Sequence, residues 1–219
     1  QGGYGAALSQ VGNMDDGRKN LEEAAKLARD LKADPVLAKI LDNQGDNYFY
    51  AGDFKAARPI YEQALQVAQR SSDRNRVLVS RLALARLAVR EGRVAEAIPA
   101  LKKLVQDAED ARFKYASAEG SVYLGEAYLL SKNYPAARQE LESAARKSDN
   151  LGLKALLARS DYLLGITLRA TGSQAEAARR FSDAAKLLED MHKESKSDAL
   201  LKRSDLKAIA ENPNGPPAK

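Results

Sequence analysis

The sequence contains no cysteine and no tryptophan, and its only histidine is His192. Without cysteine the chain can form no disulfide, no thiolate nucleophile and no cysteine-based zinc site. A Ser–His–Asp triad could be built only around His192, which we interpret as a solvated residue near the end of a polar stretch. A metal site would have to consist of carboxylates alone. We therefore predict no enzymatic activity, no metal and no cofactor.

Long apolar runs are also missing. The longest apolar stretches, such as 82–89, are interrupted by charged residues such as Arg86, whereas a membrane-spanning helix needs about 18 apolar residues in a row. No charged-then-apolar leader resembling a signal peptide is found. We predict no membrane segment. The absence of cysteine is compatible with both cytoplasm and periplasm, and we slightly prefer the cytoplasm. The chain begins with Gln1, which is compatible with a mature form or with a piece of a longer protein.

No block of charge of one sign occurs. The 35 Lys and Arg residues are interspersed with 30 Asp and Glu residues, and the formal net charge is +5. Proteins that bind nucleic acid usually concentrate positive charge on one face or tail. A nucleic-acid surface is therefore the weaker alternative, and it would use Arg86, Arg90, Arg159 and Arg169.

The sequence does contain a repeat of 40 residues. Small residues occur at this spacing, and each is followed 12 positions later by an alanine and 16 positions later by a large apolar residue. The small residues are Gly45, Ala85, Gly125 and Gly165; the alanines are Ala57, Ala97, Ala137 and Ala177; the large residues are Tyr61, Leu101, Leu141 and Phe181. A period of roughly 20–50 residues is typical of a solenoid, whose units bury their apolar faces by stacking on neighbours.

Each repeat reads as two amphipathic helices separated by a sharp break. Apolar residues follow helical spacing up to Ala51, and the pattern resumes at Phe54. The break carries glycine in four units and lysine in one, and we expect a left-handed backbone there: Gly12, Gly52, Gly92, Lys132 and Gly172. Good N-cap residues follow four of the five breaks, and Ser173 with Glu176 predicts a capping box.

These residues resemble the tetratricopeptide repeat. The pattern is a small residue and an aromatic, then Gly-Asp, then Ala-x-x-x-Tyr-x-x-Ala-Leu, and it is clearest in residues 45–65. The usual period of that family is 34 residues, and the longer period here is similar to that of kinesin light chain, spindle-orientation scaffolds and many bacterial regulators. The resemblance implies an all-α fold, an α-solenoid of stacked antiparallel helical hairpins forming a right-handed superhelix, with about five repeats and a C-terminal capping helix.

The expected boundaries follow the phase of the repeat. We expect one continuous solenoid domain, with a degenerate first repeat or N-terminal cap at 1–33, repeats at 34–73, 74–113, 114–153 and 154–194, a capping helix at 195–211 and a disordered tail at 212–219. Gly2, Gly3 and Gly5 weaken the start of a helix in the first repeat. The capping helix is read from the apolar residues within Asp198–Ala210.

The resemblance places the first helices of successive repeats on a concave inner surface, which in this family usually holds an extended or helical peptide. The expected partner-binding residues are Asp42, Asp46, Phe49, Tyr50, Arg86, Arg90, Glu119, Tyr123, Glu126, Arg159, Tyr162 and Arg169. Their charges alternate between acidic and basic from one repeat to the next. This alternation either holds the stack together, with Asp46 and Glu126 reaching Arg86 and Glu126 reaching Arg169, or selects a ligand.

The sequence therefore predicts a protein–protein interaction scaffold that binds a peptide or protein segment. The alternative is a regulatory or sensor module of a larger protein, such as a kinase or transcription regulator, in which the repeats bind their own chain or an effector.

Overall fold

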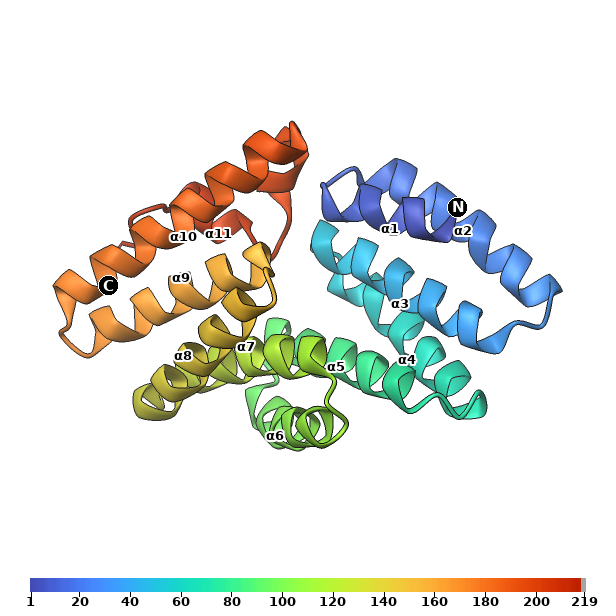
Figure 1. Ribbon diagram of the computed structural model, residues 1–219, viewed down its shortest axis with the longest axis horizontal. Helices are drawn as coiled ribbons and strands as arrows, with labels where there is room; N and C mark the ends of the chain where they lie inside the picture. The colour runs from blue at the N-terminus through green and yellow to red at the C-terminus, as the bar shows by residue number, and fades with distance from the viewer. Residues whose placement is uncertain (218–219) are drawn as a thin grey trace. The chain divides into compact units, whose positions relative to one another are not determined.

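The computed structural model describes residues 1–217, which fold entirely into helices and connecting turns (Figure 1). The described helices are α1 Gly2–Gln10, α2 Met14–Asp30, α3 Asp34–Ala51, α4 Phe54–Arg70, α5 Arg74–Arg90, α6 Val94–Asp110, α7 Lys114–Leu130, α8 Tyr134–Asn150, α9 Lys154–Ala170, α10 Gln174–Ser195, the 3₁₀ helix η1 Asp198–Lys202 and α11 Lys207–Glu211. The chain is thus an all-α repeat protein whose first ten helices form sequential hairpins, as expected of about five repeats.

Two compact units make up the structure. Unit 1 contains Gln1–Glu91 and Ser197–Ser204, and unit 2 contains Gly92–Lys196 and the residues from Asp205 onward. Unit 1 therefore holds α1 to α5 with η1, and unit 2 holds α6 to α11. The expectation of one continuous solenoid stays a prediction.

The turns recur more often than the sequence indicated. A positive φ is present at all five predicted break positions, for example 83° at Gly52 and 61° at Lys132. It also occurs halfway between them, at Lys32, Ser72, Arg112 and Gly152. The breaks within and between repeats thus have the same backbone form. Three of the added positions lack glycine, so residue identity alone did not reveal them.

Side-chain caps form at only part of the predicted N-cap positions. Asp53 accepts a hydrogen bond from the amide of Ala56 at 3.0 Å, and Asn133 accepts one from Ala136 at 3.3 Å. Ser173 is at the N-cap of α10, but its side chain makes no capping hydrogen bond, so the predicted capping box is wrong. Asp73, which the sequence reading did not single out, caps α5 through the amide of Arg76.

Small residues allow the helices of a hairpin to approach closely. A Cβ atom on Gly125 would lie 2.6 Å from Cγ of Leu141, and one on Gly165 would lie 2.6 Å from Cε1 of Phe181. Both distances are too short for a real contact, so the predicted role of these glycines in the crossing is confirmed. In the first hairpin, a Cβ on Gly5 would lie 2.9 Å from Leu21 Cγ. This glycine therefore serves helix packing, and α1 forms despite its glycine content.

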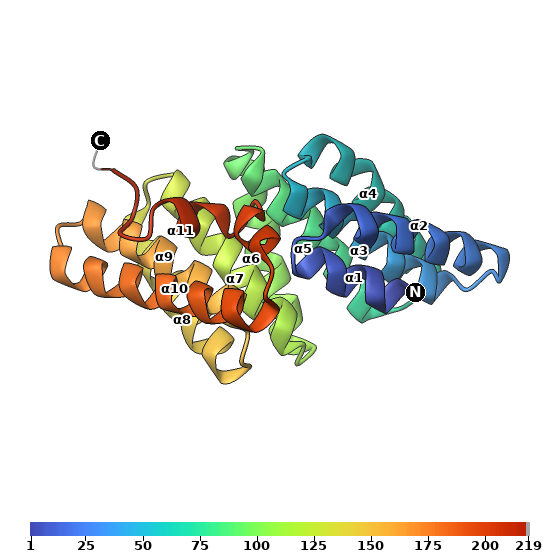
Figure 2. The same cartoon turned by 90° about the horizontal axis from the view of Figure 1, so that it is seen from above.

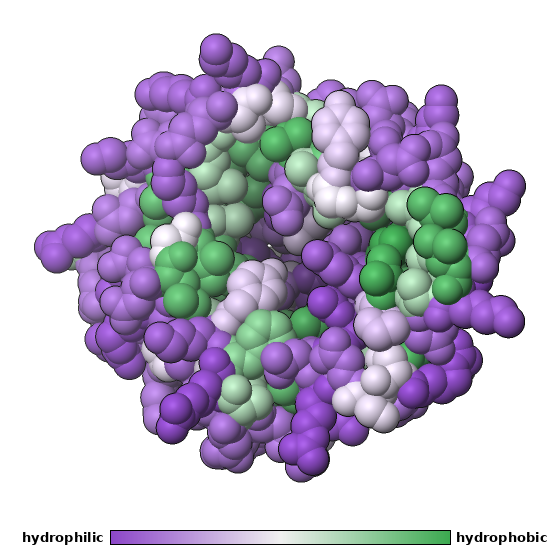
Figure 3. All heavy atoms as spheres, turned by 45° about the vertical axis from the view of Figure 1, so that its right-hand side comes forward, coloured by the Kyte–Doolittle hydropathy of each residue, from purple (hydrophilic) through white to green (hydrophobic). Residues whose placement is uncertain are grey.

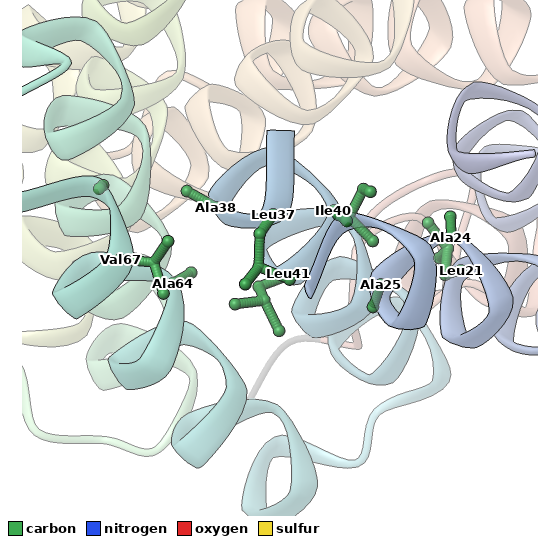
Figure 4. Packing of buried hydrophobic residues seen from close by; sticks show 11 residues of the cluster. Leu21, Ala24, Ala25, Leu37, Ala38, Ile40, Leu41, Ala64 and Val67 are labelled. Carbon is green, nitrogen blue, oxygen red and sulfur yellow. The ribbon is translucent and has the colours of Figure 1, made fainter. Parts of the chain in front are cut away.

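One core cluster of unit 1 is built from alanine, leucine, isoleucine and valine side chains on α2, α3 and α4. Leu37 and Leu41 of α3 lie between Ala25 of α2 and Ala64 of α4 (Figure 4). Their exposed fractions are 6% or less. Because most partners are alanines, the helix axes can lie close together, and each helix buries a face only against its neighbours.

The C-terminal segment, defined here as residues 197–217, differs from the expected capping helix and disordered tail. The chain forms η1, leaves helical geometry at Arg203 with φ −58° and ψ 133°, and resumes as α11. The single helix is broken because the amide and hydroxyl of Ser204 donate to carbonyl groups of α3. Within the expected tail, Pro216 accepts a hydrogen bond from Arg169; residues 218 and 219 lie outside the described part. Figure 2 shows α11 beside α10, on which it packs.

Candidate functional site

The expected inner surface of unit 1 is organised around Arg86 on α5. Its guanidinium forms an ion pair with Asp46, donates a hydrogen bond to the hydroxyl oxygen of Tyr61 at 2.7 Å, and lies 4.6 Å from the ring centroid of Phe49. Arg86 is only 3% exposed. The predicted pair between Asp46 and Arg86 is therefore present, and it joins α3 to α5 inside unit 1. Such a buried cation is held by its carboxylate and aromatic neighbours rather than by solvent.

Asp42 lies one helical turn before Asp46 on α3. Its side chain is buried, like that of Arg86. Its carboxylate accepts a hydrogen bond from Ser80 at 2.9 Å and forms an ion pair with Arg76 at 3.4 Å. Burial raises the pKa of Asp42 to about 7, and the negative charge of Asp46 adds to this effect, whereas Ser80 and Arg76 lower it. The two carboxylates of α3 thus serve different neighbours, and Asp42 is not presented to a ligand.

Tyr50 and Arg90 are predicted residues of unit 1 whose side chains contact a distant part of the chain. The guanidinium of Arg203 lies 4.0 Å from the ring centroid of Tyr50. Arg90 donates from Nη2 to the carbonyl oxygen of Ser204 at 3.1 Å. Both Tyr50 and Arg90 are partly exposed. The C-terminal segment therefore lies on the surface that the sequence assigned to a partner.

In unit 2 the central contact is the ion pair between Glu126 of α7 and Arg159 of α9. The guanidinium of Arg159 also lies 4.2 Å from the ring centroid of Tyr123. Burial lowers the pKa of Arg159, but the charges of Glu126, Tyr123 and Asp205 together raise it above its ordinary value. Arg159 is thus a permanent cation that links successive repeats, and it takes the role for Glu126 that we expected of Arg169.

Arg169 contacts the C-terminal segment instead. Its Nη2 atom donates to the carbonyl oxygen of Pro216 at 2.5 Å, and its guanidinium lies 4.9 Å from the ring centroid of Phe181. A Cβ on Gly215 would lie 2.5 Å from Cε2 of Phe181, so the segment passes directly over this ring. In unit 2, as in unit 1, a partly exposed predicted arginine binds a main-chain carbonyl of the chain itself.

The twelve predicted residues therefore separate into two groups by exposure. Eight are buried: Asp42, Phe49, Arg86, Glu119, Tyr123, Glu126, Arg159 and Tyr162. Four are partly exposed: Asp46, Tyr50, Arg90 and Arg169. For the buried members Asp42, Arg86, Glu126 and Arg159, the alternating charges hold helices together. Only the second group can meet a ligand directly, which narrows the candidate surface.

Sequence reasoning missed Arg203 and Ser204. A signal was available, because a helix continuing from Leu200 and Leu201 requires apolar residues near positions 204 and 205, where the sequence has serine and aspartate. That mismatch indicates an interrupted helix. The acceptors of these side chains, however, are backbone carbonyls of α1 and α3, and no residue pattern identifies them.

Within residues 1–217 no group of three or more His, Asp or Glu residues is placed to hold a metal ion. His192 is partly exposed on α10. None of the described helices combines the length and apolar character needed to span a bilayer. On the face drawn in Figure 3, hydrophilic side chains predominate and apolar patches lie between them.

Comparison with known proteins places these features in context. A family model described as tetratricopeptide repeat matches residues 1–70 and 37–110, and a second model with the same description matches residues 82–151. A comparison with curated proteins found no significant match.

Solved structures share the fold at low sequence identity. The crystal structure of BtubC (BKLC) from P. vanneervenii has a TM-score of 0.63 and 20% identity, over 92% of this chain and 82% of that chain. The crystal structure of a Podosopora anserina putative kinesin light chain with nearly identical TPR-like repeats has a TM-score of 0.59 and 18% identity, over 90% of this chain and 96% of that chain. Likeness at this identity shows the fold alone.

Proposed function

The chain belongs to the tetratricopeptide repeat family, and from this premise we propose that it is a protein–protein interaction module that binds extended protein segments on the first-helix surface of each unit. Domains of this family generally act as protein-binding modules. The exposed residues Tyr50, Arg90 and Arg169 are the contacts that we assign to a partner.

One observation carries this proposal. Arg90 and Arg169 each donate a hydrogen bond to a main-chain carbonyl of the C-terminal segment, at 3.1 and 2.5 Å. The same surfaces therefore already hold a polypeptide through its backbone. Binding through the backbone is general to any extended segment, whereas side-chain contacts supply the selection.

The contact of the segment with both surfaces also favours the second candidate function. In a regulatory module the repeats bind their own chain until an effector replaces it. Nucleic-acid binding is not proposed, because Arg86 and Arg159 are each 3% exposed and their guanidinium groups face Asp46 and Glu126.

To test the proposal, the chain of 219 residues serves as the target, and peptides that bind it are selected from a random display library. We expect peptides bound by unit 1 to lose most of their affinity for Tyr50→Ala, and peptides bound by unit 2 to lose most of theirs for Arg169→Glu, measured by fluorescence anisotropy. Lys103→Glu is the matched charge-reversal control, because the side chain of Lys103 is 75% exposed on the second helix α6. Substituting Arg86 or Tyr123 would test folding instead, since both are buried. Peptides that bind all three variants as well as the wild type would contradict the proposal.

A further inference from the structure

We propose that unit 1 carries a recognition site for an Arg–Ser pair in a protein segment, and that Arg203 and Ser204 of the chain occupy this site in place of a partner. This inference rests on the proposed function and names the chemistry of the ligand that unit 1 selects. The site lies where the C-terminal ends of α1 and α3 present their last carbonyl groups.

The carbonyl group of Gln10 and the ring of Tyr50 both contact the side chain at the arginine position. Arg203 donates from Nη1 to the carbonyl oxygen of Gln10, the last residue of α1, at 2.7 Å. Its guanidinium stacks on Tyr50 at 4.0 Å from the ring centroid, and the residue is only 5% exposed. Cations are stabilised at helix C-termini, and a planar guanidinium both stacks and donates. A lysine provides the charge but not this geometry.

The serine position is defined by two neighbouring carbonyl groups of α3. The hydroxyl of Ser204 donates to the carbonyl oxygen of Phe49 at 2.6 Å, and its amide donates to that of Tyr50 at 2.8 Å. The last carbonyls of a helix lack donors within the helix. The carbonyl oxygen of Phe49 also accepts from the amide of Gly52 at 3.0 Å, and Ser204 provides a donor to each of the two carbonyls. A ligand at this position needs a hydroxyl and a free backbone N–H.

The path of the chain around this pair is fixed on both sides. Ser197 donates its hydroxyl to the carbonyl oxygen of Val11 at 2.7 Å, next to the end of α1. Gly12 lies so close to the carbonyl of Ala199 that no side chain fits there. On the other side, Arg90 binds the carbonyl oxygen of Ser204. Because each of these contacts involves a backbone group, the site holds the main chain of the segment as well as two side chains, with a 3₁₀ helix before the arginine and a turn that begins at the serine.

The balance of donors and acceptors sets the class of partner. The site offers the carbonyl groups of Gln10, Val11, Phe49 and Tyr50 as acceptors, and the guanidinium of Arg90 as a donor toward the carbonyl of Ser204. A carboxylate at the arginine or serine position would face carbonyl oxygens and negative helix ends. The partner is therefore a protein segment with arginine followed by serine, and not an acidic segment.

Occupation by the chain itself lowers the affinity for such a partner. A segment attached to the same chain binds at a high effective concentration, and a free ligand competes only for the fraction of molecules in which the site is vacant. Weakening the intramolecular contacts without changing Tyr50 or Arg90 should therefore raise the affinity for an added Arg–Ser segment.

The experiment uses the 219-residue chain and a fluorescein-labelled, C-terminally amidated peptide with the sequence of residues 197–205. Binding to the wild type and to the double variant Arg203→Ala, Ser204→Ala is measured by fluorescence anisotropy. We expect the double variant to bind the peptide about tenfold more tightly or better. Peptides with alanine at the arginine or the serine position should lose that gain. Equal affinity of wild type and double variant, or equal binding of the alanine peptides, would overturn the proposal.

A matched pair of tyrosine variants locates the binding site. In the double-variant background, Tyr50→Ala should abolish peptide binding, whereas Tyr4→Ala should not, because Tyr4 is a 63% exposed tyrosine of the same unit. Circular dichroism verifies that each variant keeps its helical content. If Tyr4→Ala lost binding while Tyr50→Ala kept it, the peptide would bind elsewhere, and the assignment would be contradicted.

A second measurement needs no variant. In the wild type, the amide of Ser204 is bonded to Tyr50, so an excess of the Arg–Ser peptide should speed its hydrogen exchange, and the alanine peptides should not. Unchanged exchange would contradict the proposal. The proposed function is tested separately: library peptides that lack Arg–Ser but depend on Tyr50 would support the function and contradict only the Arg–Ser assignment.

Discussion

Asp42 joins α3 to α5 through polar contacts, but burial disfavours the ionised form of its carboxyl group. It is 3% exposed, and its carboxylate has Ser80 and Arg76 as partners. These contacts lower the pKa of Asp42 less than burial raises it. As a result, the pKa rises from 3.8 to about 7. At the same position of the later repeats, the sequence has Leu82, Val122 and Tyr162 in place of this aspartate. The structure explains the exception by the polar partners that α5 brings to it.

The raised pKa predicts a pH dependence of stability. A carboxyl group whose pKa is higher in the folded than in the unfolded state stabilises the fold below pH 4 and loses that contribution as the pH rises through 7. Relative to the wild type, Asp42→Asn should therefore gain free energy of unfolding between pH 5 and pH 8, on the order of 2–3 kcal/mol. Urea unfolding followed by circular dichroism at several pH values measures this difference.

The comparison variant for this experiment is Asp30→Asn, at an exposed position of α2 in the same unit. Its stability should follow that of the wild type at every pH. A constant difference between Asp42→Asn and the wild type from pH 5 to pH 8 would show that Asp42 is already ionised at pH 5 in the folded protein.

Hairpins and their turns are the elements that the sequence predicts best. The spacing of Gly45, Gly125 and Gly165 relative to the large residues 16 positions later reflects direct contact, since side chains at these glycines would collide with Tyr61, Leu141 and Phe181. The breaks that carry glycine were equally visible. The turns at Lys32, Ser72 and Arg112 were not, because their positive φ is imposed by the packing of neighbouring helices and not by residue preference.

The helix crossing in the fourth full repeat gives a prediction at this scale. Gly165→Ala should lower the free energy of unfolding by about 1–3 kcal/mol, because the added methyl group would lie 2.6 Å from the ring of Phe181, a side chain that is 2% exposed. Phe181 is also packed against Tyr162, at 5.4 Å between ring centroids, so it has little room to move. Chemical denaturation of the variant and the wild type measures the loss.

Gly3→Ala is the control for that substitution, since a Cβ on Gly3 would meet nothing within 4 Å. Here alanine should leave stability unchanged or raise it by up to about 1 kcal/mol, because glycine is the weaker helix former. Equal effects of the two substitutions would mean that backbone preference, and not the crossing, decides the role of Gly165.

For the molecule as a whole, the inner surface could be predicted in part. The repeat phase identified the helices. Tyr50, Arg90 and Arg169 are partly exposed, and their binding of a partner stays a prediction. The pair of Asp46 with Arg86 was expected as one alternative. The pair of Glu126 with Arg159, and the burial of both arginines, could not be predicted, because burial depends on how adjacent repeats stack. The C-terminal segment was beyond sequence reasoning for the same reason: its folded state depends on acceptors about 150 to 190 positions away, such as Phe49 and Gln10.

The last prediction concerns the contribution of the C-terminal segment to the stability of unit 2. Ile209 on α11 is 1% exposed, and α11 packs on α10 within unit 2. Ile209→Ala should therefore reduce the free energy of unfolding by about 2–4 kcal/mol. Lys207→Ala, in the same short helix but with its side chain 58% exposed, should change it by no more than about 0.5 kcal/mol. Urea denaturation of both variants tests the pair. If Ile209→Ala were as stable as Lys207→Ala, the segment would not contribute to the core, and its occupation of the inner surfaces would lose its structural basis.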